Sequence, residues 1–190
     1  MVAQNGLTQN RRRMVDLKFV SSEAAVRKQY RERVVLEQER RRLAAVCQID
    51  NEALIDRLME AGFIDDTIAA LSLGPVAAAA WGSGYVTQEE AVAATQAIFT
   101  YDAAVSGPAE VLFRSWIVNR PSNELMSLWE EFTCERIQSM SDRERETRGQ
   151  HLYNLTQQVA LASGGFAGVG QICLAERRIL DAVKRVFIIE

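Results

Sequence analysis

The sequence predicts an all-α protein with seven or eight helical segments. It has only three prolines among 190 residues and is rich in Ala, Leu, Glu, Gln and Arg, which favour helix. No segment shows the sustained alternation of polar and apolar residues that marks a half-buried strand. The pattern Gly-x-[Val/Ile]-x-x-x-Glu occurs at residues 84–90 and again at residues 170–176, each time after a long uncharged stretch. Such a repeat predicts a helix–turn–helix unit that is used twice.

The first predicted element is one long helix over residues 12–47, preceded by a polar segment, residues 1–10, that we expect to fray. The helix contains no Gly or Pro and is dense in Arg, Glu, Gln, Ala and Val. Glu37 stands four residues before Arg41, which is a favourable order for an ion pair on a helix. The apolar residues keep no heptad spacing over many turns, so the segment is a weak coiled-coil candidate.

The later helical segments are separated by polar capping residues and by Gly or Pro. Asp50 or Asn51 is placed to cap a helix over residues 52–61, which Gly62 ends. Asp65 or Asp66 is expected to cap the next helix, and the Gly-Pro pair at 74–75 should bend or split it. The remaining segments are predicted over residues 88–101, 108–119 with Pro108 first, 123–140, 141–162 opened by a Ser141–Glu144 capping box, and 174–188.

The repeated pattern has the spacing of a calcium-binding loop, where a Gly at position six makes the turn and a Glu at position twelve binds the ion. The carboxylates expected at positions one, three and five are absent: these positions hold Ala79, Trp81 and Ser83 in the first copy and Gly165, Ala167 and Val169 in the second. We therefore predict no metal site. Gly84 and Gly170 should adopt positive φ in the two turns, and Glu90 should cap the next helix together with Thr87. Glu176 occupies the place of Glu90 in the second copy.

Charge divides the chain into a basic N-terminal arm, residues 1–46, and an acidic domain, residues 47–190. The arm holds eleven basic and five acidic residues, a net charge of +6, whereas the domain holds eleven basic and twenty acidic residues, a net charge of −9. This asymmetry predicts that the arm contacts an anionic partner, which leaves open nucleic acid, an anionic membrane surface or the acidic body of another copy. Two clusters are the candidate contact residues: Arg11, Arg12 and Arg13, and Arg40, Arg41 and Arg42.

No other pattern indicates a catalytic, cofactor or small-molecule site. Residues 165–170 have the glycine spacing of a phosphate-binding loop, but Gln171 and Ile172 follow where Lys and Ser or Thr are needed. His151 is the only histidine, and we expect it to be structural rather than catalytic. The arginine clusters show neither a recognised motif nor the interleaving with aromatic or Asn/Gln residues that is typical of nucleic-acid binding, and the rest of the chain is acidic, which argues against that partner. A core position is predicted for the three tryptophans, Trp81, Trp116 and Trp129.

The cysteines and the uncharged stretches bear on the compartment. Cys47, Cys134 and Cys173 are isolated from one another and odd in number, which indicates free thiols and a cytoplasmic protein. The uncharged stretches, residues 67–88 and 152–175, approach the length of a membrane span but contain too many polar and Gly residues. We therefore expect buried core helices, with membrane contact at most peripheral.

Residues 77–90, Ala-Ala-Ala-Ala-Trp-Gly-Ser-Gly-Tyr-Val-Thr-Gln-Glu-Glu, resemble the central motif of TerB-like proteins, the helical family associated with tellurite resistance. Residues 159–180 are similar to the second copy of that motif, so the resemblance covers roughly residues 50–190. Ser83 and Val169 stand where the family has an acidic residue before the Gly, so a metal-linked role does not carry over. The resemblance implies an all-helical domain, often fused to other modules or attached to membrane-associated stress complexes, without enzymatic activity.

These observations predict a non-enzymatic scaffold or interaction protein. Its basic N-terminal helix is expected to dock onto a protein assembly, another subunit or an anionic surface, and no cofactor is implied. The alternative is a stress-response protein that binds or senses ions through weak carboxylate ligands, namely Asp65, Asp66, Glu89 and Glu90.

Overall fold

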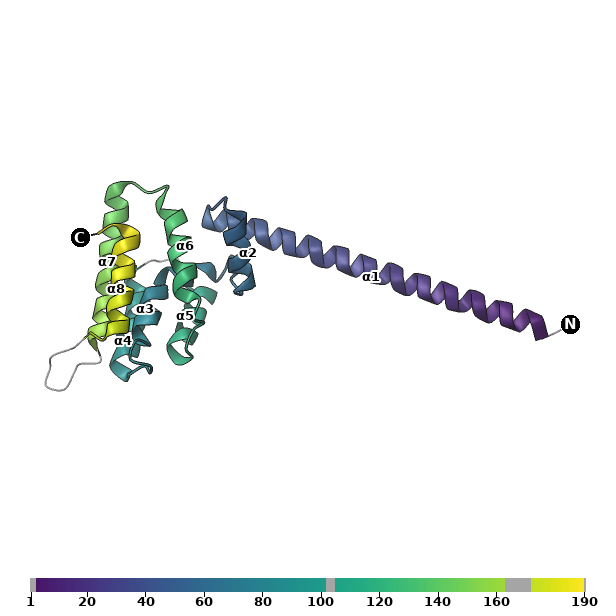
Figure 1. The fold of residues 1–190 in the computed structure, drawn as a ribbon, viewed down its shortest axis with the longest axis horizontal. Coiled ribbons are helices and arrows are strands. Elements are labelled where there is room, and N and C mark those ends of the chain that lie inside the picture. The colour runs from purple at the N-terminus through teal and green to yellow at the C-terminus, as the bar shows by residue number, and fades with distance from the viewer. Residues whose placement is uncertain (1–2, 102–104, 163–171, 190) are drawn as a thin grey trace. The chain divides into compact units, whose positions relative to one another are not determined.

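The computed structural model describes residues 3–101, 105–162 and 172–189, with side chains from residue 23 onward (Figure 1). These residues form eight α-helices and one 3-10 helix and contain no strand, which confirms the all-α prediction. The elements are α1 (Ala3–Cys47), α2 (Glu52–Glu60), η1 (Ile68–Leu73), α3 (Gly74–Ala80), α4 (Gln88–Tyr101), α5 (Pro108–Val118), α6 (Leu125–Ile137), α7 (Asp142–Ala162) and α8 (Leu174–Phe187).

Helix α1 starts earlier than expected, because the polar segment before residue 12 is helical from Ala3. Apart from one Gly, residues 3–11 contain no helix breaker, so the helix propagates toward the N-terminus once it has formed. The chain divides into two compact units between Arg42 and Leu43. We call residues 3–42 the arm and residues 43–189 the body. This boundary lies four residues before the one expected from charge, since Leu43 and Cys47 are fully buried in the core of the body.

Local capping accounts for most of the helix boundaries in the body. The backbone N–H of Leu54 donates to the side chain of Asn51, 3.2 Å away, so Asn51 rather than Asp50 caps α2. Gly62, with a φ of +86°, follows the helix as predicted. At α7, the backbone N–H of Glu144 donates to Ser141 Oγ and the N–H of Ser141 donates to the Glu144 carboxylate. This arrangement confirms the predicted capping box.

The predicted helix before Trp81 is split, as the Gly-Pro pair indicated, into the 3-10 helix η1 and the α-helix α3. The prediction that Asp65 or Asp66 caps it is wrong, because the N-cap is Thr67 and no side-chain hydrogen bond caps the helix. The Thr67 hydroxyl instead accepts from the backbone N–H of Ile64, 3.0 Å away, which stabilises the turn before η1. Pro75 is the second residue of α3, where a proline removes no intrahelical hydrogen bond.

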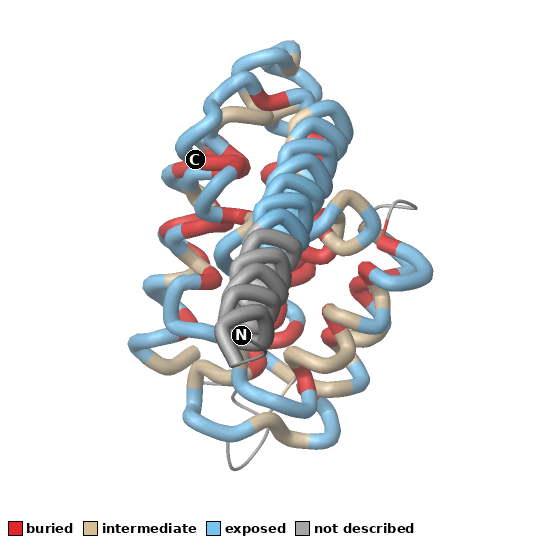
Figure 2. Tube along the Cα trace, turned by 90° about the vertical axis from the view of Figure 1, so that its right-hand side faces the viewer, coloured by how far each residue is buried: buried red, intermediate tan, exposed pale blue. Residues whose placement is uncertain are grey.

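Helix α3 lies at the centre of the body and consists only of Gly, Pro, Val and Ala. It packs against α4, α5, α6, α7 and α8, and six of its seven residues are buried. In Figure 2 the buried residues of the body, in red, gather on the sides of its helices that face one another. The first uncharged stretch is thus a core segment, as predicted. Of the described helices, none combines the length and apolar character needed to cross a bilayer.

Helices α7 and α8 approach each other closely at Gly149. A Cβ atom added to Gly149 would lie 2.4 Å from Cβ of Phe187, which is nearer than two carbon atoms can approach without a shift. Phe187 is buried and its ring centroid is 6.5 Å from that of Trp129 on α6. Gly149 therefore allows α8 to place Phe187 against α6 and the core.

We expect Gly149→Ala to lower the free energy of unfolding by about 1–3 kcal/mol, because overpacking at the Phe187 contact outweighs the gain of about 1 kcal/mol in helix propensity. Urea denaturation followed by circular dichroism measures the change. Gln150→Ala is the matched control, since Gln150 is the exposed neighbour on the same helix and should change stability by less than about 0.5 kcal/mol. A Gly149→Ala protein that is more stable than the parent would contradict the close approach.

Candidate functional site

The arm exposes side chains around its whole circumference. Between residues 23 and 42 no side chain is buried, and this stretch carries seven basic and four acidic residues. Ion pairs between residues four apart support the helix: Arg27 with Glu23, Lys28 with Glu32, and Arg41 with Glu37 at 3.0 Å, which is the pair that the sequence predicted. Arg11, Arg12 and Arg13 lie on the helical backbone of α1, and their side chains lie outside the described residues.

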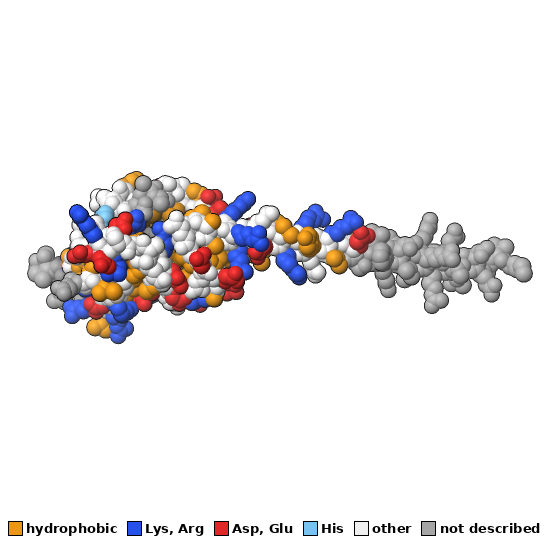
Figure 3. Space-filling model, turned by 90° about the horizontal axis from the view of Figure 1, so that it is seen from above, with side chains coloured by type: hydrophobic (Ala, Val, Ile, Leu, Met, Phe, Trp, Pro, Cys, Tyr) orange, Lys and Arg blue, Asp and Glu red, His pale blue; other side chains and the backbone are white. Residues whose placement is uncertain are grey.

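Apolar side chains are also exposed on the arm, which the sequence analysis missed. Val26, Tyr30 and Val34 are 63%, 68% and 37% exposed, and Val35 and Leu36 are exposed beside them. Because their spacing is four residues, Val26, Tyr30 and Val34 lie along one side of the helix. Figure 3 shows blue basic and orange apolar side chains together on the described part of the arm. The spacing of four was visible in the sequence, but the exposure of these side chains on the helix was not predicted from it.

The arginines of the second cluster point in different directions around the helix and do not form one surface patch. Consecutive residues on an α-helix point about 100° apart, so Arg40, Arg41 and Arg42 face three different directions. Arg41 and Arg42 are exposed, and Arg40 is half-buried. A flat partner surface therefore contacts one or two of these arginines, whereas a partner that wraps the helix contacts all three.

The two repeated turns end in equivalent capping boxes. In the first, the N–H of Thr87 donates to Glu90 Oε2 at 2.7 Å and the N–H of Glu90 donates to Thr87 Oγ1 at 3.2 Å. In the second, the N–H of Cys173 donates to Glu176 Oε2 at 2.7 Å and the N–H of Glu176 donates to Cys173 Sγ at 3.5 Å. The first box confirms the prediction. The second was missed because Cys is rarely considered a cap, although Cys173 holds the place of Thr87 in the repeat.

The glutamates of both boxes are buried, so they are structural rather than surface groups. Glu90 is 0% exposed, and its Oε1 accepts no hydrogen bond within the described part of the chain. Glu176 is 2% exposed and packs on Gly82, where an added Cβ would lie 2.5 Å from Glu176 Cγ. Gly84 has the predicted positive φ, +99°, and Gly170 lies outside the described residues. The first turn is therefore a tight corner closed by a buried carboxylate.

The carboxylates considered as ion ligands are not brought together. Asp65 and Asp66 lie in the segment before η1, and Glu89 is exposed at the start of α4 beside the buried Glu90. Over the described ranges, no group of three or more His, Cys, Asp or Glu side chains has the arrangement of a metal site. The described residues therefore show no arrangement of ligands that supports the ion-binding alternative.

The aromatic residues singled out in the sequence are mainly structural. Trp129 is fully buried, and Trp81 and Trp116 are half-buried, with Trp81 Nε1 donating to the backbone carbonyl of Trp116 at 2.6 Å. His151 is half-buried on α7, and its ring centroid is 5.6 Å from that of Tyr101. The core position predicted for tryptophan holds fully for Trp129, while the other two reach the surface on one side.

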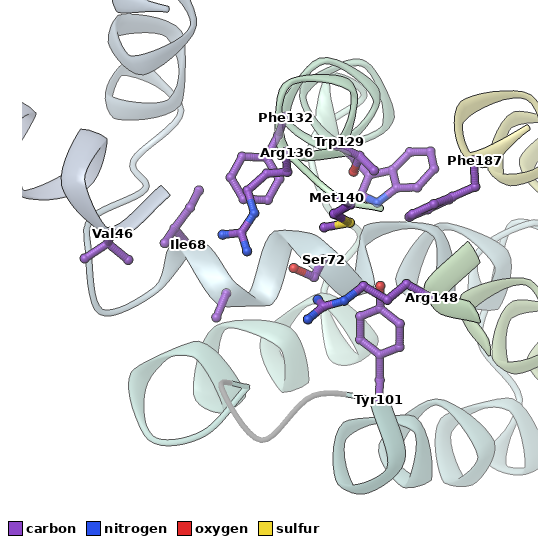
Figure 4. A pocket seen from close by; sticks show the side chains of 12 residues that line it. Val46, Ile68, Ser72, Tyr101, Trp129, Phe132, Arg136, Met140, Arg148 and Phe187 are labelled. Carbon is purple, nitrogen blue, oxygen red and sulfur yellow. The ribbon is translucent and has the colours of Figure 1, made fainter. Parts of the chain in front are cut away.

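A cavity of about 160 Å³ opens in the body and was not predicted from the sequence (Figure 4). Aromatic and aliphatic side chains from η1, α4, α6 and α8 form most of its wall, and two arginines enter it from α6 and α7. The lining residues are Val46, Ile68, Ala69, Ser72, Tyr101, Trp129, Phe132, Thr133, Arg136, Met140, Arg148 and Phe187. They come from six separate segments of the chain, so no local sequence pattern identifies the site.

The charged side chains in the lining of the cavity are arginines. Of the described residues that line it, two are arginines and none is acidic. The guanidinium carbon of Arg136 lies 5.8 Å from the centroid of the Phe132 ring, a cation–π contact that orients it.

Burial raises the pKa of the Cys47 thiol to about 11, and the charge of Arg136 opposes that shift only in part. Hydrogen bonds from Ser141 lower the pKa of Glu144, and Arg148 adds to this effect.

Comparison of this chain with models of known protein families, with curated proteins and with solved structures finds no match. The resemblance to TerB-like proteins therefore stays a prediction based on residues 77–90 and 159–180. The arm and the cavity are accordingly interpreted from their own chemistry.

We expect Gly84→Val to lower the free energy of unfolding by about 1–3 kcal/mol, because a β-branched residue is strained at positive φ. No atom lies within 4 Å of the position of the added Cβ, so a clash would not explain the loss. Gly84→Asn is the control, since Asn tolerates positive φ better and should cost less. Equal losses for Val and Asn in urea denaturation would argue against a backbone origin.

The equivalence of the two capping boxes can be tested by exchanging their caps. We expect Cys173→Thr to raise the free energy of unfolding by about 0.5–1 kcal/mol, because a hydroxyl is a better acceptor than a thiol at the N-cap. The reciprocal Thr87→Cys should lower it by a similar amount. Differential scanning calorimetry of both variants measures the shifts, and opposite signs from those expected would show that the boxes do not act alike.

Proposed function

We propose that this chain is a non-enzymatic interaction protein that uses its arm to dock onto an acidic protein surface. The observation that carries the proposal is the exposure of both basic and apolar side chains on residues 23–42. In this proposal the body, which resembles TerB-like domains in sequence, is the helical platform from which the arm acts. A cytoplasmic location belongs to the proposal as well, supported by the three free cysteines.

The energetics of the arm favour a docked state. In proteins most helical stability comes from packing of an apolar face, and exposed ion pairs four residues apart add only about 0.3–0.5 kcal/mol each. The exposed Val26, Tyr30 and Leu36 are 63%, 68% and 57% accessible, so a partner can still bury most of their surface. Burial of apolar surface contributes roughly 25 cal/mol per Å², which makes these residues the main source of affinity.

The basic residues of the arm favour a partner with a negatively charged surface. With a net charge of +3 over residues 23–42, the arm attracts acidic surfaces and repels basic ones. The body of a second copy qualifies, since the chain after residue 46 carries a net charge of −9. An anionic membrane has the same sign of charge and serves as the competing outcome in the test.

We expect reversal of Arg40, Arg41 and Arg42 to Glu in the full chain to abolish association at low salt, because the arm then loses its net positive charge. Sedimentation velocity at about 0.05 M and about 0.5 M NaCl measures self-association, which should also weaken as salt screens the contact. Co-sedimentation with vesicles that contain phosphatidylserine tests the membrane alternative.

The matched control reverses Arg120, Arg143 and Arg177, which are exposed on the body and give the same change in net charge. An arm deletion should end at residue 42, because Leu43 belongs to the core of the body and its loss would confound the result. Association that is equal in the parent, the arm variant and the control at both salt concentrations would refute docking through the arm. Loss with the control alone would move the contact to the body.

A further inference from the structure

Helix α4 exposes apolar side chains on the side that faces away from the core. Val92 and Phe99 are 52% and 74% exposed, and Gln96 is exposed between them. Residues spaced by three and four positions lie along one side of an α-helix. The opposite side of α4 carries the buried Ala94 and Ala97. Val92 and Phe99 therefore contribute little to the core of their own chain, and most of their surface is accessible to a partner.

The same side of α4 also carries negative charge. Glu89 is exposed three residues before Val92, in the first turn of the helix. The helix contains no Lys or Arg. On α5, which packs against α4, Arg114 is held by Glu110 at 2.8 Å. An approaching basic helix is therefore attracted by Glu89 and meets no basic residue of α4.

We propose that this surface of α4 receives the arm of a second copy of the chain. We call it the α4 face, and it is formed by Glu89, Val92, Gln96 and Phe99. The inference rests on the proposed docking function of the arm, because it names the acidic surface that the arm binds. Each copy of the chain supplies both an arm and an α4 face.

The arm and the α4 face match in length and in charge. On the arm, Val26, Tyr30 and Val34 form an exposed apolar stripe of eight residues, or about 12 Å at a rise of about 1.5 Å per residue. Val92 and Phe99 span about 10 Å by the same rise. Two helices with apolar stripes of similar length can bury them against each other by packing side by side. The seven basic and four acidic residues of the arm between positions 23 and 42 complement the acidic end of the α4 face.

The most acidic part of the body suits the arm less well. Helices α2 and α6 together carry six acidic and two basic residues. Their exposed uncharged side chains are only Ala53, Ser127 and Cys134. This surface attracts the arm, but it offers no large apolar side chain to cover Val26 and Tyr30. It is the first alternative that the experiment must separate from the α4 face.

Helix α5 is the second alternative, because it exposes apolar side chains without net charge. Val111 and Val118 are 68% and 76% exposed. The charges of Glu110 and Arg114 on this helix compensate each other in an ion pair. Of the three surfaces, only the α4 face combines large exposed apolar side chains with an acidic residue and no basic one. The spacing of Val111 and Val118 equals that of Val92 and Phe99, so α5 supplies a matched control.

A contact between two single helix faces is small. Interfaces that bury less than about 1,200 Å² are typical of weak or transient complexes, so we expect a dissociation constant in the micromolar range. In such a small interface the central aromatic residue carries much of the affinity. The charged residues at the rim mainly affect the rate of association and its dependence on salt. Removal of Phe99 should therefore weaken the complex more than removal of the charge of Glu89.

The first experiment removes the apolar surface of α4 in the full chain. Val92→Ala combined with Phe99→Ala should weaken self-association at least about tenfold at about 0.05 M NaCl. Sedimentation velocity measures the dissociation constant. The control, Val111→Ala combined with Val118→Ala on α5, should change it by less than about twofold. Alanine favours helix, so both double variants should keep the fold, which circular dichroism checks.

A second, milder variant tests the charge. Glu89→Gln keeps the size of the side chain and should weaken association by about two- to fivefold, the range for an exposed ion pair. The difference should disappear at about 0.5 M NaCl, where such a contact is screened. Glu146→Gln is the matched control, because Glu146 is exposed on α7. Equal weakening by both variants would show that the arm responds only to the overall charge of the body.

Mixing two variants tests whether the arm and the α4 face bind each other. The first variant carries Arg40→Glu, Arg41→Glu and Arg42→Glu and keeps the α4 face. The second carries Val92→Ala and Phe99→Ala and keeps the arm. Neither variant should associate alone. Their mixture should form a 1:1 complex, because the intact arm of the second variant binds the intact α4 face of the first.

Each contrary result has its own meaning. If the α4 variant associates like the parent while the arm variant does not, the arm docks elsewhere and only the present inference fails. If both associate like the parent, the proposed function of the arm fails as well. An equal loss in the α5 control, or a mixture that does not associate, would overturn the pairing of the arm with α4. A parent chain that binds vesicles containing phosphatidylserine but does not self-associate would overturn the choice of a second copy as the partner.

Discussion

The body depends on the small size of the side chains in α3. This seven-residue helix has no side chain larger than Val or Pro, and it is buried against five other α-helices. Small residues let neighbouring backbones approach closely, and the larger side chains of those neighbours then fill the space between them. At Gly74 an added Cβ would lie 3.3 Å from Cβ of Trp129, so even this first residue of α3 has little room to grow. The aromatic residues of α6 and α8 that line the cavity belong to helices that pack against α3.

Two buried glutamates fix how the chain enters the helices that pack on this centre. Glu90 and Glu176 each bind the backbone of the residue three positions earlier, and each is almost inaccessible to solvent. A carboxylate that accepts an N–H at a helix N-terminus satisfies a backbone donor and interacts favourably with the helix dipole. The glutamates that first looked like possible ion ligands are therefore part of the architecture. The candidate docking chemistry lies elsewhere, on the arm.

The arm and the cavity differ in how far the sequence could lead to them. The basic character of the arm is a property of composition, and the charge difference at residue 46 was enough to predict a docking element. The cavity is different, because Ser72, Arg136 and Arg148 come from three elements and each reads alone as an ordinary helix residue. From the sequence alone, Arg136 and Arg148 resemble solvated surface residues, because they lie twelve residues apart on different helices. Only packing places both at the edge of one aromatic pocket.

The sequence by itself determined the helical class, the breaks at Gly62 and Gly74–Pro75, and the boxes at Thr87 and Ser141, because caps, turns and breakers act over a few residues. It also determined the basic arm and the repeated pattern. The N-cap at Thr67 and the capping box at Cys173 are also local, although the sequence analysis did not single them out. Tertiary structure decided that Leu43 belongs to the core. It also decided where the aromatic cavity forms. These features depend on contacts between residues distant in the chain, and the free energy of such contacts is not encoded in any local window.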